Sequence, residues 1–388
     1  MKILFITPSP PNKLNRIRAF YLIKGLHKCG AKVTLVSLYS NDKELEDLKE
    51  LKPYLEETFL VKNNYVISLV KALASIFTPY SMEMGFCLNI RLFRLLFSLR
   101  DGYDYIYLKR LRMASYAFIF PAKKVFVDET DSMSLSYKNM YREDRGIKKL
   151  FFLEEFLKYS LAESHYLKYY QFVLCSKNDI KYLESKHVKA IEPILLENGL
   201  DLDLWSNKKK YNSDYRVGNE LFFWGLLNYV PNRKSLIEFT STILPKLSEK
   251  YEFNIIGPGK KFDLPSKVHD RVHFLGFVND ITKEIKKFDI FICPLIMGTG
   301  IKNKIIQAAA LGIPIVATEV AVDGVDEKLK NFFFIAENRD YSQKIEEIQK
   351  LTGTEISSRM SSQANYAQER YNSTNMIRVF YVKYLGDK

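Results

Sequence analysis

Two lysines that follow a glycine-rich turn are the residues of this chain best suited to chemistry. The turn spans 298–300 (Gly-Thr-Gly), and Lys302 and Lys304 stand near the start of an expected helix that ends at Gly312. Glycines let the backbone approach a ligand, and the first turn of a helix offers free amide donors and a partial positive charge. With two ammonium groups added, the segment is suited to a phosphate or diphosphate.

The elements around this segment are those of a parallel α/β sheet. An apolar strand precedes the turn, and another follows the helix at once. Similar short runs rich in Ile, Val, Phe and Leu alternate with helical patterns along the whole chain. We expect strands at 2–7, 32–38, 57–62, 105–109, 124–128, 172–176 and 193–197, and then at 221–225, 253–257, 272–275, 290–295, 315–318 and 332–336.

The two series of strands predict two Rossmann-like domains. A length of 388 residues is sufficient for about two domains with separate cores. The polar, lysine-rich segment between the series has no periodicity, which is typical of a linker. We therefore expect a first domain at 1–205, a linker at 206–219 and a second domain at 220–371.

Composition limits the class of protein. The four cysteines are far apart without metal-ligand spacing, and no run reaches the roughly 18 apolar residues of a membrane span. We expect reduced thiols, a cytoplasmic protein and no metal site. The net charge of +13 suits a protein that binds an anionic lipid surface or a nucleotide substrate. A general bias of the genome toward lysine explains this charge equally well. No nucleic-acid-binding module is visible, so nucleic acid is not an expected partner.

The order of several phrases resembles retaining glycosyltransferase family 4. In the second half these are FFWGLLNYVPNRKSLIEF, IIGPGKK, VHFLGFVNDI, FDIFICPL and PLIMGTGIKNKIIQAAALGIPIVAT; in the first half they are YDYIYLKRLRMASYA, VLCSKNDIKYLES and ENGLDLDLW. The resemblance implies the GT-B fold, in which two Rossmann-like domains face a cleft. It also implies an acceptor-side first domain, a donor-binding second domain and a C-terminal helix (372–388) that crosses back to the first domain.

By the same resemblance, the second domain binds a nucleotide-diphosphate sugar, with a UDP-sugar favoured. The predicted donor-binding residues are Gly298, Thr299, Gly300, Ile301, Lys302, Lys304, Gln307, Asn228, Asn232, Phe277 and Val278. Many relatives have glutamate at positions 299 and 307, and an arginine and a lysine at positions 226 and 232. Here these positions hold Thr299, Gln307, Leu226 and Asn232. Asn232 either lies near the phosphates or caps the helix that follows it.

Lys304 and Asp131 are the predicted catalytic residues. A retaining enzyme of this fold must stabilise a departing nucleoside diphosphate, and Lys304 supplies the charge without a metal or cofactor. Asp131 follows a strand of the first domain, where many family members have a histidine nearby. Its carboxylate binds substrate hydroxyls or balances positive charge, or else it caps the next helix together with Ser132 and Ser134.

The acceptor side is less defined. Asn12, Arg16 and Arg18 are the polar residues expected to reach the cleft, with a solvated helix face as the alternative for Arg18. Segments 67–77 and 89–100 are amphipathic and basic, which suits a lipid-linked acceptor or peripheral binding to an anionic membrane. Alternatively, their apolar faces pack on the sheet.

Together these features predict a metal-independent retaining glycosyltransferase. It would move a hexose-type sugar to a glycan or lipid-linked acceptor in bacterial surface polysaccharide synthesis. A degenerate GT-B protein that binds ligand as a scaffold subunit is the alternative. The residue types do not identify the donor sugar, the acceptor or the oligomeric state.

Overall fold

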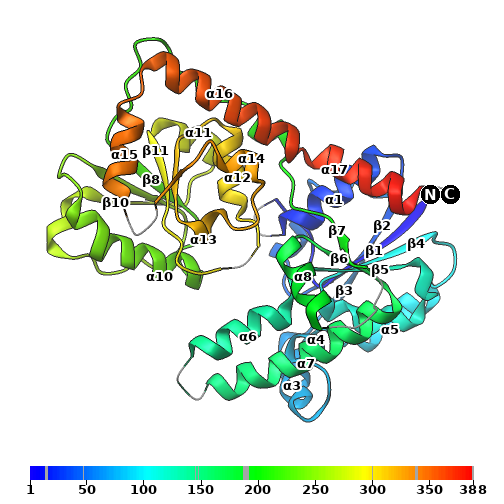
Figure 1. The fold of residues 1–388 in the computed structure, drawn as a ribbon. Helices are drawn as coiled ribbons and strands as arrows, with labels where there is room; N and C mark the ends of the chain where they lie inside the picture. Colours follow the sequence, from blue (N-terminus) through cyan, green and yellow to red (C-terminus); the bar gives the residue numbers. More distant parts are fainter. Residues whose placement is uncertain are drawn as a thin grey trace. The chain divides into compact units, whose positions relative to one another are not determined.

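The computed structural model shows two compact units (Figure 1). One comprises Met1–Asn198 together with Ser373–Lys388, and the other comprises Gly199–Asn372. The structure describes residues 1–13, 16–46, 48–144, 146, 148–186, 192–298, 300–336 and 340–386. In the described part of the chain, no helix combines the length and the apolar character that crossing a bilayer requires.

A parallel sheet forms the centre of the first unit, with strand order β3-β2-β1-β4-β5-β6-β7. Of its central strands, β5 is buried along its whole length and β1 from Ile3 onward, as a sheet covered on both sides requires. The strands are β1 Lys2–Thr7, β2 Lys32–Tyr39, β3 Glu57–Lys62, β4 Tyr105–Lys109, β5 Val125–Thr130, β6 Gln171–Leu174 and β7 Ile194–Leu195.

The second unit has its own parallel sheet, with strand order β10-β9-β8-β11-β12-β13. The strands are β8 Glu220–Trp224, β9 Glu252–Ile256, β10 Val272–Gly276, β11 Ile290–Cys293, β12 Ile315–Ala317 and β13 Phe334–Ile335. Every expected strand overlaps an observed one. The prediction of two Rossmann-like domains is confirmed.

Helices cover both sheets (Figure 1). In the first unit they are α1 Ile17–Lys28, α2 Lys43–Glu46, α3 Tyr65–Ala74, α4 Met82–Cys87, α5 Ile90–Ser98, α6 Met133–Glu143, α7 Lys148–Tyr169, α8 Lys177–Lys186 and α17 Ser373–Phe380. In the second unit they are α9 Leu202–Trp205, α10 Val230–Glu238, α11 Ile281–Glu284, α12 Asn303–Ala310, α13 Glu319–Val322, α14 Glu327–Lys330, α15 Tyr341–Gln349 and α16 Gly353–Arg370.

The C-terminal helix α17 belongs to the first unit. It lies along α1 (Figure 1), and Gly25 makes the close approach possible. A Cβ at Gly25 would lie 2.5 Å from the Cδ1 atom of Ile377. The last helix therefore returns to the first domain, as the family resemblance implied.

The segment expected to be a linker, 206–219, lies within the second unit. Lys209 donates its backbone N–H to the carbonyl of Leu311 (2.8 Å), and the Tyr211 hydroxyl donates to the carbonyl of Gly312 (2.8 Å). These bonds hold the segment against the turn after α12. The second unit consequently begins at Gly199, earlier than the sequence suggested.

Candidate functional site

Glycine loops follow several strands of the second unit. Because its strands are parallel, the loops after β8, β9, β10 and β11 share one edge of the sheet, which is where ligands bind in open α/β sheets. A Cβ at Gly257 would lie 2.1 Å from the carbonyl oxygen of Gly225, so a larger residue does not fit between these two loops. Gly298 has φ 123°, a left-handed conformation that favours glycine.

The side chain of Lys304 lies at this edge of the sheet. Its ammonium donates to Asn232 Oδ1 at 2.9 Å and lies 4.0 Å from the centroid of the Phe223 ring. Burial is the main cause that lowers the pKa of Lys304 to about 8. Among the described residues, Lys304 forms no ion pair with a carboxylate. Its charge is therefore available to an anionic ligand.

Asn232 holds Lys304 in place. Besides accepting from the ammonium, it donates through Nδ2 to the carbonyl of Leu226 (2.9 Å). Helix α10 begins at Val230 with Tyr229 as its N-cap, so Asn232 lies inside the first turn. The alternative in which Asn232 caps this helix is therefore wrong, because the helix starts before it.

The start of α12 is not capped by the side chain of its N-cap residue. Its N-cap is Lys302, whose side chain makes no cap hydrogen bond and instead donates to the carbonyl of Gly298 at 3.3 Å. Gly300 is left-handed (φ 71°) and Ile301 is buried. The Gln307 amide lies on the same helix as Lys304, and its side chain has no hydrogen-bond partner in the described part of the chain.

The remaining predicted donor residues lie in neighbouring loops. Asn228 Oδ1 accepts from the backbone N–H of Lys260 (2.9 Å), which ties the loop after β8 to the loop after β9. Phe277, just after β10, is exposed, and Val278 packs partly against the core. Thr299 lies outside the described residues. Contacts therefore join Lys304 to Asn232 and Lys302 to Gly298, while Asn228, Phe277 and Val278 occupy loops on the same sheet edge.

In the first unit, Arg18 is part of a buried charge cluster. Its Nε atom lies 3.1 Å from Asp128 Oδ2, and its Nη1 donates to Asn198 Oδ1 at 3.0 Å. Tyr107 donates to the same carboxylate at 2.7 Å, and Lys109 Nζ lies 3.0 Å from it. The alternative of a solvated helix face for Arg18 is therefore wrong, since only 13% of its side chain is exposed.

The charges and the burial of this cluster shift the pKa values of its members. Burial acts to raise the pKa of Asp128, but the charges of Arg18 and Lys109 outweigh it and hold that pKa below its ordinary value. Burial lowers the pKa of Lys109 to about 7. Tyr107, Lys109 and Asp128 are not among the site residues expected from the sequence, although Lys109 and Asp128, polar residues near the ends of apolar strands, are a visible signal.

Arg16 and Asn12, predicted on the acceptor side, hold the loop after β1. Arg16 Nη2 binds Glu44 Oε1 at 2.7 Å, and its Nη1 donates to the carbonyl of Pro10. Asn12 Oδ1 accepts from the Arg16 backbone N–H at 3.1 Å. An acceptor contact through either residue stays a prediction.

Asp131 does not cap a helix. Ser132 is the N-cap of α6, and the thiol of Cys175 donates to Asp131 Oδ1 at 3.0 Å. The capping alternative for Asp131 is therefore wrong. The neighbouring Thr130 has φ 78°, and Arg110, at the end of adjacent β4, has φ 71°. Such conformations are strained for residues with a side chain and gather at functional sites.

The second unit carries the sequence signal of a known family. Residues 218–353 match the model of glycosyl transferases group 1. This stretch contains the glycine loops, Asn232 and Lys304. No curated protein sequence matches the chain significantly.

Solved structures show the fold of the whole chain. Anabaena Alr3699/HepE, crystallised with UDP, is 16% identical with a TM-score of 0.65, covering 98% of each chain. Sucrose-phosphate synthase from Thermosynechococcus elongatus is 13% identical with a TM-score of 0.70, covering 98% of this chain and 97% of its own. WaaG, a glycosyltransferase involved in lipopolysaccharide biosynthesis, is 12% identical with a TM-score of 0.66, covering 99% and 100%. The fold is that of GT-B glycosyltransferases.

Proposed function

We propose that this chain is a retaining glycosyltransferase of family 4 that uses a nucleotide-diphosphate sugar without a metal. The observation that carries the proposal is Lys304, a partly buried cation without a carboxylate partner among the described residues, set beside the glycine loops. The match of residues 218–353 to glycosyl transferases group 1 supports the same activity.

The chemistry follows from the charge of the leaving group. As the bond between sugar and diphosphate breaks, negative charge grows on the diphosphate, and fixed positive groups stabilise that state more than the ground state. Lys304, Lys302 and the uncapped amides of α12 supply such groups. Gln307 lies one turn further along the helix, where it would hold the ribose.

A uridine nucleotide is the proposed donor, and a glycan or lipid-linked molecule the proposed acceptor. The structurally similar Anabaena Alr3699/HepE has been crystallised with UDP and with UDP-glucose. The likeness to WaaG, described as acting in lipopolysaccharide biosynthesis, supports an acceptor of a bacterial surface glycan. Asp131 and the residues Asn12, Arg16 and Arg18 remain the proposed first-unit contacts.

We expect UDP to bind the purified chain equally well with and without EDTA. The reason is that lysines and helix amides, not a bridging cation, would neutralise the diphosphate. Isothermal titration calorimetry with UDP, with EDTA and with added Mg²⁺, measures this directly. If EDTA abolished binding and Mg²⁺ restored it, the diphosphate site would depend on a metal and this part of the proposal would be wrong.

A second proposal, that the first unit binds an anionic membrane, comes from helix α3. All residues of α3 are described, and only Ser68 and Ala72 are buried, whereas Val66 and Val70 are 67% and 60% exposed. Phe77, just beyond the helix, is 92% exposed. Such a contiguous apolar surface on a soluble unit marks an interaction site.

Charge indicates that the partner is anionic lipid. Lys62, Arg91 and Arg94 are exposed on neighbouring segments, so cations accompany the apolar surface. Helix α5 contributes less apolar surface to this proposed membrane-binding face than its sequence pattern suggested. Leu92 and Leu96 are buried in the core, so its apolar face packs on the sheet as the alternative held.

We expect the chain to sediment with vesicles that contain phosphatidylglycerol at low salt, and to be released by salt. Electrostatic attraction to the lipid acts within a Debye length of about 10 Å at moderate salt, whereas the apolar contacts of α3 add affinity. Val70→Glu should abolish sedimentation. Val382→Glu is the matched control because Val382 is 67% exposed, no less than Val70, but lies near the C-terminus. Equal sedimentation of both variants would refute the role of α3.

A further inference from the structure

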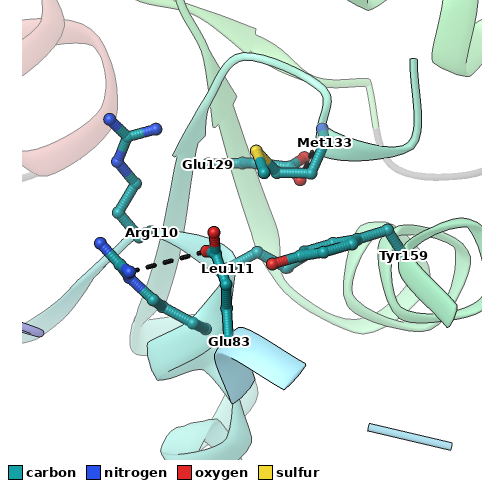
Figure 2. A pocket seen from close by; sticks show the side chains of 7 residues that line it. Glu83, Arg110, Leu111, Glu129, Met133 and Tyr159 are labelled. Carbon is teal, nitrogen blue, oxygen red and sulfur yellow. Dashed lines mark hydrogen bonds and ion pairs between the residues drawn. The ribbon is translucent and has the colours of Figure 1, made fainter. Parts of the chain in front are cut away.

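A pocket of about 160 Å³ lies in the first unit beyond the ends of β4 and β5 (Figure 2). Arg110 and Arg112 border it after β4, Glu129 at the end of β5, Glu83 from α4, and Tyr159 from α7. Met133 and Leu111 complete the wall. The donor residues of the second unit take no part in this pocket.

Two polar groups of the wall lack hydrogen-bond partners within it. Tyr159 is 1% exposed, and within the described chain its hydroxyl makes no hydrogen bond to another residue of the pocket wall. The Nε atom of Arg112 is also buried without a partner, although its Nη1 lies 3.6 Å from Glu83 Oε2. Figure 2 shows the Tyr159 hydroxyl directed toward the space beside Glu83. Buried polar groups are normally hydrogen-bonded. A ligand in the pocket that accepts hydrogen bonds would therefore satisfy both groups.

Of the charges in the wall, the ion pair of Arg112 and Glu83 favours a neutral polar ligand, while the second cation, Arg110, is exposed to solvent. Glu83 already compensates Arg112 in an ion pair, and its carboxylate would repel an anion. Burial, followed by the neighbouring Glu163, raises the pKa of Glu129 well above its ordinary value, which favours the uncharged form of this carboxyl. Guanidinium, carboxyl and phenol groups together offer donors and acceptors side by side, which is what hydroxyl groups need.

The size and the lining of the pocket restrict the class of ligand further. A cavity of about 150 Å³ is known to hold a six-membered ring, so this pocket has room for a single ring. The Tyr159 ring, Leu111 and Met133 contribute apolar surface to the wall. A pyranose has a C–H face and a rim of hydroxyls that match these two sides.

We propose that this pocket holds one sugar unit of the acceptor, with Arg112 and Tyr159 donating hydrogen bonds to its hydroxyls and Glu83 accepting one. The proposal rests on the proposed function, since it names the class of acceptor. The strained backbone of Arg110 fits a binding role, because it sets the turn from which Leu111 and Arg112 reach the pocket.

The test uses the full chain labelled with ¹³C at its methionine methyl groups. Methyl glycosides of glucose, galactose, mannose and N-acetylglucosamine are titrated, and the Met133 signal, assigned with Met133→Leu, is followed by NMR. At least one glycoside is expected to shift this signal saturably. Tyr159→Phe should raise the Kd about tenfold, the equivalent of one neutral hydrogen bond. Tyr170→Phe, a change of the same kind in a buried tyrosine outside the pocket, should not.

Tyr159→Phe removes only a hydroxyl that makes no hydrogen bond within the wall and keeps the buried ring, so the variant is expected to fold. If no glycoside shifts Met133, or if Tyr159→Phe binds as well as wild type, the sugar site is refuted. A shift by inorganic phosphate alone also refutes it, in favour of an anion site. UDP calorimetry on the same sample separates the two proposals: UDP binding without a glycoside shift refutes only the pocket, and the reverse result refutes only the donor site.

Discussion

Lys304→Ala is expected to lower turnover by about 100-fold or more while weakening nucleotide binding much less. The ammonium faces a diphosphate whose charge grows as the sugar leaves, so its contribution is larger in the transition state than in the bound substrate. Removing one donor that stabilises a developing anion costs roughly 10²–10³ in rate in well-studied enzymes. Release of UDP from UDP-sugar gives kcat, and calorimetry with UDP gives the affinity.

The matched comparison is Gln307, which shares α12 with Lys304. Gln307→Glu, which restores the residue common in relatives, should keep or improve donor affinity. Gln307→Leu leaves the ribose hydroxyls unpaired and should cost about 1–3 kcal/mol of donor affinity with little change in kcat. Full activity of Lys304→Ala would show that its catalytic role is wrong. No turnover by wild type with any donor and acceptor would favour the scaffold alternative.

The pKa of Lys304 gives the same experiment a second readout. Burial lowers this pKa to about 8, so the free protein begins to lose the ammonium charge as pH rises through that value. A bound diphosphate favours the charged form and raises the pKa, so binding near pH 8 should take up protons. UDP affinity should therefore fall above about pH 8 in wild type, and Lys304→Ala should flatten this dependence.

Local patterns were sufficient to predict the fold. The strands of both sheets are short apolar runs, and the change from strand to glycine turn to helix at Ile290–Ala310 is visible without any long-range information. Parallel topology then places Gly225 and Gly298 on the same edge of one sheet. The contact between Lys304 and Asn232 agrees with the donor residues chosen by resemblance, although their binding role stays a prediction.

Side-chain partners across the fold were harder to predict. The pattern of α3 predicts an amphipathic helix, but it does not show that the small residues Ser68 and Ala72 face inward while the large apolar residues face outward. Similarly, Arg18 and Asp128 are far apart in sequence and meet only in the folded first unit. Such pairs depend on tertiary geometry, which a single sequence does not contain.

Asp128→Asn is expected to destabilise the first unit by about 3–5 kcal/mol, because it leaves the buried charges of Arg18 and Lys109 uncompensated. This is a large part of the roughly 5–15 kcal/mol that stabilises a typical domain. The pKa of Asp128 is lowered in the folded state, so its stabilisation is present above its ordinary pKa of about 4 and is lost as pH falls below it. The difference between wild type and variant should shrink in acid.

Tryptophan fluorescence follows the second unit during chemical denaturation, because Trp205 and Trp224, the two tryptophans of the chain, both belong to it. Asp128→Asn should shift a transition seen by circular dichroism and leave the tryptophan-detected transition in place.

Asp179→Asn is the control for the effect of Asp128→Asn. Burial, and then the charge of Asp131, raise the pKa of Asp179 to about 7, so its ionised form destabilises the fold above that pH. Removing it should leave the protein as stable or more stable at high pH. If both variants lost the same amount of stability at high pH, the cause would be general damage to packing and not the loss of the charge pairing of Asp128.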